Sequence, residues 1–251
     1  MSKKRWDEYY IRFKNQFLVD EKHMVAFQES INKEIDLSKL TKKSIFLEIG
    51  CGPFLLGRIL SKRCQMVIGV DYSVVAMRLA EEMFKREGVT NYLLIQADIV
   101  HLPLKSECID FAYGGGVVEH IEEVKQCIME LGRVVKKGGT SFNSVPIVNI
   151  GALTYRQIWG NIPDIPVLKY VYKFVHFKLL KTKLHFGYER SYRVGAFKKW
   201  HYQAGFKEVE MKRLPLEPEL GFLPTSIRGF FSKLAKNSIL FWPMACFTAT
   251  K

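Results

Sequence analysis

Cysteine is scarce in the sequence, and no pair of cysteines has the spacing of a metal site. The five cysteines are scattered, odd in number and contain no C-x-x-C pair. Zinc sites and disulfide frameworks need such pairs, so we expect neither, and no bound metal. Reduced thiols are typical of a cytoplasmic protein, which is the location we predict.

Long hydrophobic runs are also missing. The amino terminus, Met1 to Tyr10, is charged and lacks the apolar segment of a secretory signal. The longest apolar stretch, Ile239 to Phe247, is interrupted by Pro243 and is far shorter than the roughly 20 residues that cross a bilayer. We therefore expect no transmembrane segment, and only peripheral contact with a membrane stays open.

Acidic residues are few relative to basic ones. The 38 Lys and Arg residues against 25 Asp and Glu residues give a formal net charge of +13. Such an excess attracts nucleic acid, an anionic membrane surface or a phosphorylated metabolite. The basic residues form only short clusters such as Lys3-Lys4-Arg5, and a solvated lysine-rich surface explains them equally well. Charge alone selects no partner.

Short apolar runs alternate with helical patterns over the first part of the chain. The 251 residues, 48% of them hydrophobic, suit one α/β domain that carries an insertion. The alternation predicts a doubly wound, mostly parallel α/β sheet covered by helices on both faces. The predicted strands are 44–49, 66–70, 92–95, 108–113 and 140–145, and the predicted helices are 54–62, 74–87 and 122–135.

The alternation stops after Val145. Residues 146–193 are rich in aromatic and basic side chains, and we interpret them as an insertion. A helix over 194–203 and a strand over 206–212 follow, then a loop with three prolines and a last strand over 240–250. This closing strand pair fits a sheet with one antiparallel member.

Two glycines form a tight turn behind the first predicted strand, where Phe46 to Phe54 reads Phe-Leu-Glu-Ile-Gly-Cys-Gly-Pro-Phe. Glycine allows a sharp turn and the close approach of a ligand. A dinucleotide fingerprint would need a further glycine at Leu55, and Glu48 would repel a pyrophosphate. The carboxylate of Glu48 suits a cationic or amino-bearing ligand instead.

Three acidic residues stand at the ends of three successive predicted strands. They are Glu48, Asp71 within Gly-Val-Asp-Tyr-Ser, and Asp98 within Gln-Ala-Asp-Ile. Ligands of such sheets bind outside the carboxyl ends of the strands, and an acid about 20 residues after a glycine turn can accept hydrogen bonds from ribose hydroxyls. Capping of the following helix by Asp71 or Ser73 is the alternative. We predict that the three carboxylates converge around one ligand.

Together with Gly114-Gly115-Gly116, Val-Val-Glu-His-Ile from Val117 and Arg133 to Gly139, these motifs resemble the class I S-adenosylmethionine-dependent methyltransferases. The small-molecule branch, with ubiquinone- and menaquinone-type enzymes, is the most similar. The resemblance runs from Thr41 to Val145 and resumes weakly from Tyr192 to Glu210. It implies a seven-stranded Rossmann-like sheet, S-adenosylmethionine as the cofactor, and methyl transfer to a small-molecule acceptor.

The resemblance also implies roles around the cofactor. The residues implied for its methionine part are Glu48, Gly50, Cys51, Gly52 and Gly115, with Glu48 orienting either the turn or the amino group. The residues implied for the ribose and adenine are Asp71, Tyr72, Asp98 and Ile99. Phe54 stands where the family often has a third glycine, so its ring either narrows the pocket or points into the core.

Methyl transfer needs an aligned acceptor and the exclusion of water. If the acceptor atom carries a proton, a general base assists, and His120 is our candidate. Its alternatives are the start of a helix or a contact with the cofactor alone. Residues 1–40 are predicted to form a helical lid, or else a helix packed on the sheet edge, and 41–251 the methyltransferase domain.

The insertion is the predicted cover of the acceptor site. Within it, 167–180 fits a membrane-surface helix, a cover over an apolar acceptor, or a packed helix with solvated lysines. We expect a small acceptor that is anionic or lipid-like. The candidate acceptor-site residues are Tyr10, Tyr155, Arg156, Tyr188 and Tyr192.

Two other functions compete with this interpretation. The positive charge favours RNA methylation, but no N-P-P-[YF] sequence follows the fourth strand and no binding domain is appended, so nucleic acid is the less favoured partner. A non-catalytic module that binds S-adenosylmethionine is the other alternative.

Overall fold

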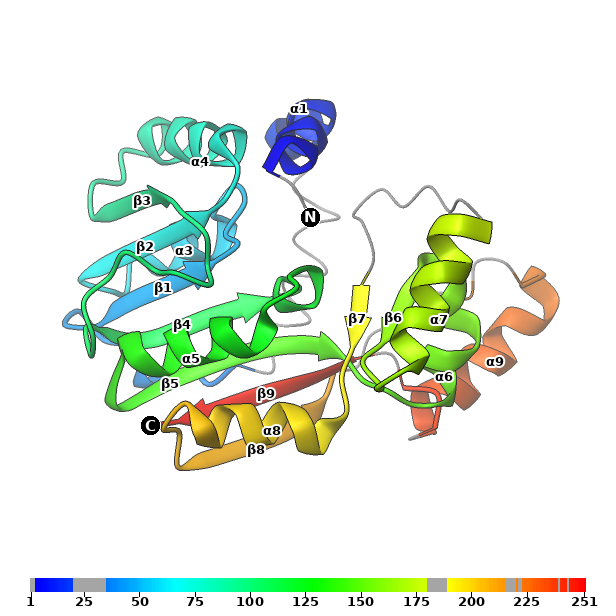
Figure 1. The fold of residues 1–251 in the computed structure, drawn as a ribbon. Coiled ribbons are helices and arrows are strands. Elements are labelled where there is room, and N and C mark those ends of the chain that lie inside the picture. Colours follow the sequence, from blue (N-terminus) through cyan, green and yellow to red (C-terminus); the bar gives the residue numbers. More distant parts are fainter. Residues whose placement is uncertain are drawn as a thin grey trace.

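The computed structural model describes residues 3–19, 35–179, 189–214, 220, 223–238, 240–242 and 244–251. Seven strands form one sheet in the order β3-β2-β1-β4-β5-β9-β8 (Figure 1). β9 runs antiparallel to both of its neighbours, and the other paired strands are parallel. The strands are β1 (Ile45–Ile49), β2 (Met66–Asp71), β3 (Tyr92–Gln96), β4 (Ile109–Gly115), β5 (Val135–Pro146), β8 (Glu208–Arg213) and β9 (Met244–Thr250). The predicted Rossmann-like fold with one antiparallel strand is confirmed.

Helices cover the sheet on both faces because successive strand residues point to opposite sides. In β1, Phe46 packs into the core beneath α3 and α4, whereas Leu47 packs into the core beneath α5 and α8. Both faces are therefore apolar, as a sheet buried on two sides requires. The helices are α3 (Leu55–Leu60), α4 (Val74–Arg86), α5 (Val124–Val134) and α8 (Val194–Gln203).

Local signals set the ends of α4. The Ser73 hydroxyl accepts a hydrogen bond from the Ala76 amide at the first turn, which is the usual role of serine before a helix. Gly88, with φ of +66°, follows the last turn, where glycine adopts the left-handed conformation without strain. The amino end of α4 is thereby fixed directly behind Asp71.

The insertion forms a separate small unit beyond the carboxyl ends of β4 and β5 (Figure 1). Its strands pair in parallel, and a bridge between Ile147 and Tyr192 closes it onto the end of β5. Its elements are α6 (Ile150–Leu153), η3 (Tyr155–Trp159), β6 (Asn161–Pro163), α7 (Leu168–Phe174), the π-helical η4 (Val175–Leu179) and β7 (Glu189–Ser191). The helix predicted over 167–180 corresponds to α7 and η4.

One predicted element is wrong. The segment between β8 and β9, predicted as a proline-containing loop, holds the 13-residue helix α9 (Thr225–Asn237). Pro224 stands directly before its first turn, where the missing N–H of proline leaves no helical hydrogen bond unmade. The last strand starts at Met244 instead of residue 240, because Leu240 and Phe241 form a turn.

Two shorter elements, η1 (Leu37–Lys39) and η2 (Val118–His120), and the amino-terminal helix α1 (Lys3–Val19) complete the described elements. Among these, no helix combines the length and the apolar content needed to cross a bilayer.

Candidate functional site

The turn after β1 depends on glycine at two positions. Gly50 and Gly52 have φ of +55° and +51°, a conformation that side chains disfavour. A Cβ on Gly50 would lie 2.5 Å from Val117 Cγ1, and one on Gly52 would lie 2.7 Å from the Tyr10 hydroxyl oxygen. Backbone conformation and close approach thus both require glycine here. Cys51, between them, is buried and its amide donates to the Val70 carbonyl.

Asp71 ties this turn to the next one. Its Oδ2 accepts from the Gly52 amide at 2.9 Å, and its Oδ1 accepts from the Ser73 amide at 2.8 Å. Burial raises the pKa of this carboxyl, and the hydrogen bonds from Ser73 and Gly52 oppose the rise. The carboxylate therefore holds together the turns that follow β1 and β2.

Glu48 is buried in β1 beneath the glycine turn. Its Oε2 accepts from the Gly57 amide of α3 at 3.2 Å. Burial raises its pKa to about 8, and the neighbouring Asp71 carboxylate adds to the rise. The contact with Gly57 supports the role of orienting the turn and its helix, whereas a role toward an amino group stays a prediction.

The third acid lies farther out. Asp98 is exposed, and its Oδ1 accepts from the Val100 amide at 3.1 Å. Ile99 beside it is buried in the core. Tyr72 has 41% of its surface exposed, and its carbonyl accepts from the Gln96 amide group at the end of β3. The three predicted carboxylates thus share the carboxyl edge of the sheet, two of them buried and in electrostatic contact.

β4 ends at this edge as well. Gly115 is its last residue, and a Cβ there would lie 2.2 Å from the Tyr113 hydroxyl oxygen. The following Gly116 amide donates to the Ser144 hydroxyl of β5. These contacts hold the predicted cofactor loop at Gly115 on the sheet.

Phe54 points into the core. It keeps the left-handed conformation, with φ of +56°, yet its ring is fully buried and stacks on Phe84 at 5.2 Å. A Cβ on Gly57 would lie 1.9 Å from this ring, and one on Gly69 would lie 2.9 Å from it. Glycines at 57 and 69 therefore make room for Phe54, and the ring does not narrow the cofactor side of the turn.

Helix α1 closes over the turns. Asp7 accepts hydrogen bonds from the Ser73 hydroxyl and from the Val75 amide at the start of α4. Tyr10 is buried with its hydroxyl against Gly52, and burial raises its pKa, with Asp71 and Cys51 adding to the rise. The Trp6 ring meets the His120 ring edge to face at 5.7 Å. The first turns of α1 thus cover the glycine turn, Asp71 and His120 together.

His120 ends η2, directly after β4. Its Nδ1 is buried and has no hydrogen-bond partner within the described part of the chain. Burial lowers its pKa, and the carboxylate of Glu189 opposes this. A neutral imidazole with an available nitrogen can accept a proton. Glu119, the residue before His120, is also buried, and its Oε2 has no hydrogen-bond partner within the described part of the chain.

The insertion brings an ion pair to η2. Arg156 is buried, and its Nη2 donates to Glu189 Oε2 at 2.6 Å. Arg156 Nε is buried without a partner among the described residues. Burial is the main cause that raises the pKa of Glu119. The Glu189 carboxylate adds to this rise, and the Arg156 guanidinium opposes it. Arg156, Glu189 and Glu119 therefore form one cluster of ionisable side chains beside His120, in which Arg156 and Glu119 are buried.

The remaining candidates lie in different surroundings. The Tyr192 hydroxyl donates to the Val118 carbonyl at 3.4 Å and so contacts the first residue of η2. The Tyr155 hydroxyl donates to the Phe241 carbonyl, so it faces the segment before β9. Tyr188 lies outside the described residues.

Sequence reasoning missed several contacts of the site. It assigned no role to Asp7, to Val117 or to Glu119, although Glu119 directly precedes His120. Adjacency to His120 was an available signal for Glu119. No local pattern reveals the pairing of Asp7 with Ser73, 66 residues away.

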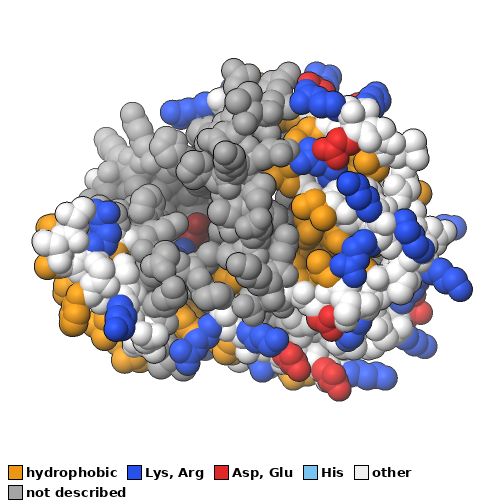
Figure 2. Space-filling view, turned by 180° about the vertical axis from the view of Figure 1, so that it is seen from behind, with side chains coloured by type: hydrophobic (Ala, Val, Ile, Leu, Met, Phe, Trp, Pro, Cys, Tyr) orange, Lys and Arg blue, Asp and Glu red, His pale blue; other side chains and the backbone are white. Residues whose placement is uncertain are grey.

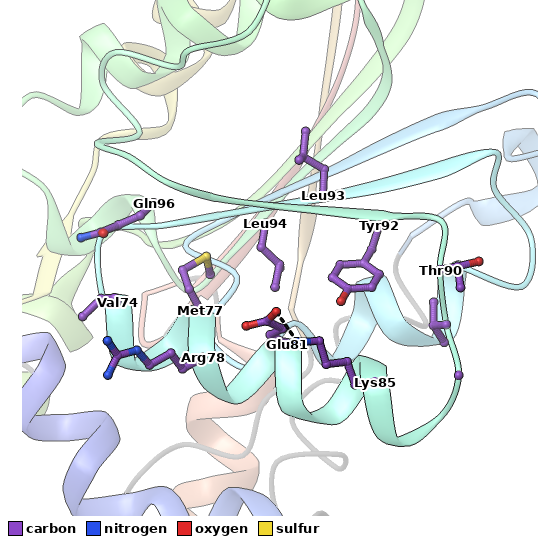
Figure 3. Close-up of a pocket in the computed structure, with 12 residues that line it drawn as sticks. Val74, Met77, Arg78, Glu81, Lys85, Thr90, Tyr92, Leu93, Leu94 and Gln96 are labelled. Atoms are coloured by element: carbon purple, nitrogen blue, oxygen red, sulfur yellow. Dashed lines mark ion pairs between the residues drawn. The ribbon is translucent and has the colours of Figure 1, made fainter.

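A groove of about 800 Å³ lies between α4 and the edge strand β3 (Figure 3). Its walls include the exposed ion pair between Lys85 and Glu81. Gln96 lines one end of it, but Glu48, Asp71 and His120 do not contribute to it. The groove is therefore separate from the candidate site.

The chain resembles known methyltransferases in sequence. The family model described as a methyltransferase domain matches residues 47–142. A malonyl-[acyl-carrier protein] O-methyltransferase of Hamiltonella defensa is 25% identical over 169 residues, covering 65% of this chain and 63% of that protein. A demethylmenaquinone methyltransferase of Staphylococcus carnosus is 25% identical over 216 residues, covering 70% and 87%. The chain spans less than two thirds of the length of the malonyl-specific relatives, 63% and 55% of two of them.

Solved structures share the fold. A geranyl diphosphate C-methyltransferase of Streptomyces coelicolor, in complex with S-adenosyl-L-homocysteine, superposes with a TM-score of 0.65 at 13% identity, covering 92% of this chain and 81% of that one. At this identity the likeness establishes the architecture only.

Proposed function

We propose that this chain, which belongs to the class I S-adenosylmethionine-dependent methyltransferases, transfers the cofactor's methyl group to a small-molecule acceptor. The observation that carries the proposal is the Asp71 carboxylate, which joins the amides of Gly52 and Ser73 at the carboxyl edge of the sheet. It lies within the residues that match the methyltransferase domain.

The residues at this edge fit the cofactor chemically. S-adenosylmethionine carries a sulfonium, an amino group and ribose hydroxyls, and it supplies an electrophilic methyl group when bound. Each oxygen of Asp71 accepts one backbone N–H and retains a second lone pair for a ribose hydroxyl. Tyr72, which follows Asp71, and exposed Asp98, which follows the neighbouring strand β3, are proposed for the adenine. Gly50, Cys51, Gly52, Ile99 and Gly115 complete the proposed binding residues.

His120 is the proposed general base. Burial keeps its imidazole neutral by lowering the pKa, so that it can take the proton that the acceptor atom loses. Trp6 shields the ring on one side, which helps to exclude water. The α1 lid is proposed to close the site in the same way.

The acceptor is proposed to be anionic or lipid-like and to bind between η2 and the insertion. Arg156, with its buried and unpartnered Nε in the described structure, suits an anionic group. The relatives' names point to malonyl and quinone acceptors in those proteins. Tyr10, Tyr155, Tyr188 and Tyr192 are proposed as its surroundings, with a cytoplasmic location and peripheral membrane contact.

The test has two steps. Calorimetry measures binding of S-adenosylhomocysteine, and tritiated S-adenosylmethionine then labels lipid, metabolite and RNA extracts that are counted separately. We expect binding, and label in the lipid or metabolite fraction. His120→Ala should lower methyl transfer by about 100-fold or more and leave cofactor affinity unchanged, because His120 contacts the acceptor side.

The exposed His101 provides the matched control, and His101→Ala should leave transfer intact. Absence of cofactor binding would overturn the function altogether, and binding without transfer to any fraction would identify a non-catalytic module. Label in RNA alone would overturn the acceptor class. Full activity of His120→Ala would overturn only the general base.

A further inference from the structure

Helix α9 turns its apolar stripe toward solvent. Ile227, Phe230, Phe231 and Leu234 follow the i, i+3, i+4, i+7 spacing of one helical face. All four are exposed, Phe230 to 70%. On a helix of a globular protein this stripe normally packs on the core. Its exposure therefore calls for a partner.

The helical part of the insertion repeats the pattern. Val167, Tyr170, Val171 and Phe174 have the same spacing, from the residue before α7 to its last residue, and all are exposed. Of the 17 exposed large hydrophobic side chains among the described residues, six lie in 167–179 and five in 227–240. The two segments thus hold most of the exposed large hydrophobic side chains of the described residues on a small part of the chain.

The charged residues within these two segments are all basic. No Asp or Glu occurs between residues 165 and 188, and none occurs after Glu219. Lys169 and Lys173 pair with Asp164 and Glu122, which lie outside α7. Lys178 and Lys233 are exposed beside the apolar residues.

The two segments lie at one end of the molecule. In Figure 1, α7 and α9 both stand beyond the carboxyl ends of β4 and β5, next to the insertion that borders η2. Figure 2 shows this end from behind, where hydrophobic and basic side chains gather around α9. The exposed apolar surface is therefore placed beside the proposed acceptor side of the site.

We propose that 167–179 and 225–238, together with Leu240, form one docking surface for the headgroup region of an anionic bilayer. Exposed aromatic side chains enter the boundary between headgroups and acyl chains, and lysines beside them are attracted to anionic lipids. A second copy of the chain would bring two positive surfaces together, which charge repulsion opposes. Docked in this way, the acceptor side of the sheet edge faces the membrane.

The orientation rests on the proposed function, because it assumes that the acceptor enters beside η2. Docking itself does not, since vesicle binding is measured without methyl transfer. The chain is centrifuged with phosphatidylcholine vesicles and with vesicles in which roughly one lipid in three is phosphatidylglycerol. We expect binding to the anionic vesicles, weaker binding to the neutral ones, and release when salt rises from about 0.05 M to about 0.5 M.

Matched variants test the surface. Phe230→Ser/Phe231→Ser and Tyr170→Ser/Phe174→Ser should each lower the partition coefficient at least tenfold. Ile59→Ser/Tyr202→Ser removes apolar side chains of comparable exposure, 58% and 50%, from α3 and α8, and should leave binding unchanged. Circular dichroism checks that each variant is folded.

Charge variants test the headgroup. Lys178→Glu/Lys233→Glu should abolish the preference for anionic vesicles. Lys137→Glu/Lys207→Glu, which changes exposed lysines beside the last residues of β9, should preserve it.

Several results would overturn the proposal. Absence of binding to both vesicles would do so, as would equal loss in the Ile59/Tyr202 control. Equal binding to neutral and anionic vesicles would overturn the anionic assignment. Sedimentation equilibrium completes the test, because a dimer that the Phe230/Phe231 variant dissociates would identify a second copy as the occupant.

Discussion

The proposed cofactor side and the proposed acceptor side of the sheet edge are built in opposite ways. On the cofactor side, both oxygens of Asp71 accept backbone amides and Glu48 accepts another. On the acceptor side, polar atoms are buried without partners in the described structure, and the neighbouring helices expose apolar stripes. Four of the six residues with such atoms lie at the junction of η2 and the insertion: Glu119, His120, Arg156 and Asn161.

Buried polar groups in folded proteins are normally hydrogen-bonded, and exceptions need an explanation. The two others, Asn143 and His201, lie elsewhere, in β5 and α8. The concentration of unpartnered atoms around η2 supports the proposal that a bound molecule completes the hydrogen bonding of the proposed acceptor side. Preorganisation of the proposed cofactor side lowers the ordering cost of binding there.

The largest effect is expected from a substitution of Asp71 on the proposed cofactor side. Asp71→Asn keeps the shape of the side chain but replaces one acceptor oxygen by an amide donor, which faces the N–H of Gly52 or Ser73. Cofactor affinity should fall about 100-fold, or roughly 2.7 kcal/mol, as measured by calorimetry.

Asp110→Asn is the matched control. Like Asp71, Asp110 accepts a backbone amide, but its donor is Ile45 and it lies at the amino ends of the strands. It should cost stability without changing cofactor affinity. Equal loss of affinity in both variants would show that the effect is one of general stability and would contradict the role of Asp71.

The cofactor side was largely predictable from sequence because its signals are local. The strand that ends at Asp71 and the glycine turn at Gly50 follow from short runs of residues and the φ that they allow. The convergence of Glu48 with Asp71 follows from the parallel sheet. Glu48 reaches the Gly57 amide, a contact that depends on the exact position of α3 and that no pattern specifies.

The acceptor side was poorly predictable. The stripe from Ile227 to Leu234 has helical spacing, but the prolines before it favoured a loop. Pro224 is compatible with the helix because it stands directly before the first turn. The contact of Arg156 with Glu189 joins residues far apart in sequence, and so does that of Asp7 with Ser73 on the proposed cofactor side. Their pairing follows from how the insertion and α1 fold back, which local patterns do not encode.

A smaller effect is expected from a substitution of Phe54, which stands where the family often has a glycine. Phe54→Gly relieves a left-handed conformation that costs about 1 kcal/mol, but it removes a ring packed on Phe84 and over Gly57. Loss of a buried phenylalanine side chain costs about 3–5 kcal/mol. The free energy of unfolding in urea should therefore fall by about 2 kcal/mol or more.

Glu107 separates the two contributions. It is exposed and also has a positive φ of 52°, so Glu107→Gly relieves strain without emptying a core, although it gives up an exposed ion pair with Lys251. It should be neutral or slightly stabilising. An increase in stability for Phe54→Gly would mean that the ring is not part of the core.

The last prediction concerns the proposed acceptor side and its pH dependence. Burial raises the pKa of Glu119 from its ordinary 4.5 to about 8. Between these values the native protein holds a proton that the unfolded chain has released, so the free energy of unfolding falls as pH rises through this window. One such group contributes at most about 1.4 kcal/mol per pH unit. Glu119→Gln should flatten that slope in urea titrations from pH 5 to pH 8, while Glu48, whose pKa is also about 8, keeps a residual slope of the same sign.

The exposed Glu107→Gln controls for the loss of a surface carboxylate. A slope that is unchanged in Glu119→Gln would mean that Glu119 is already ionised in the native protein, which would contradict the raised pKa of this buried carboxyl group.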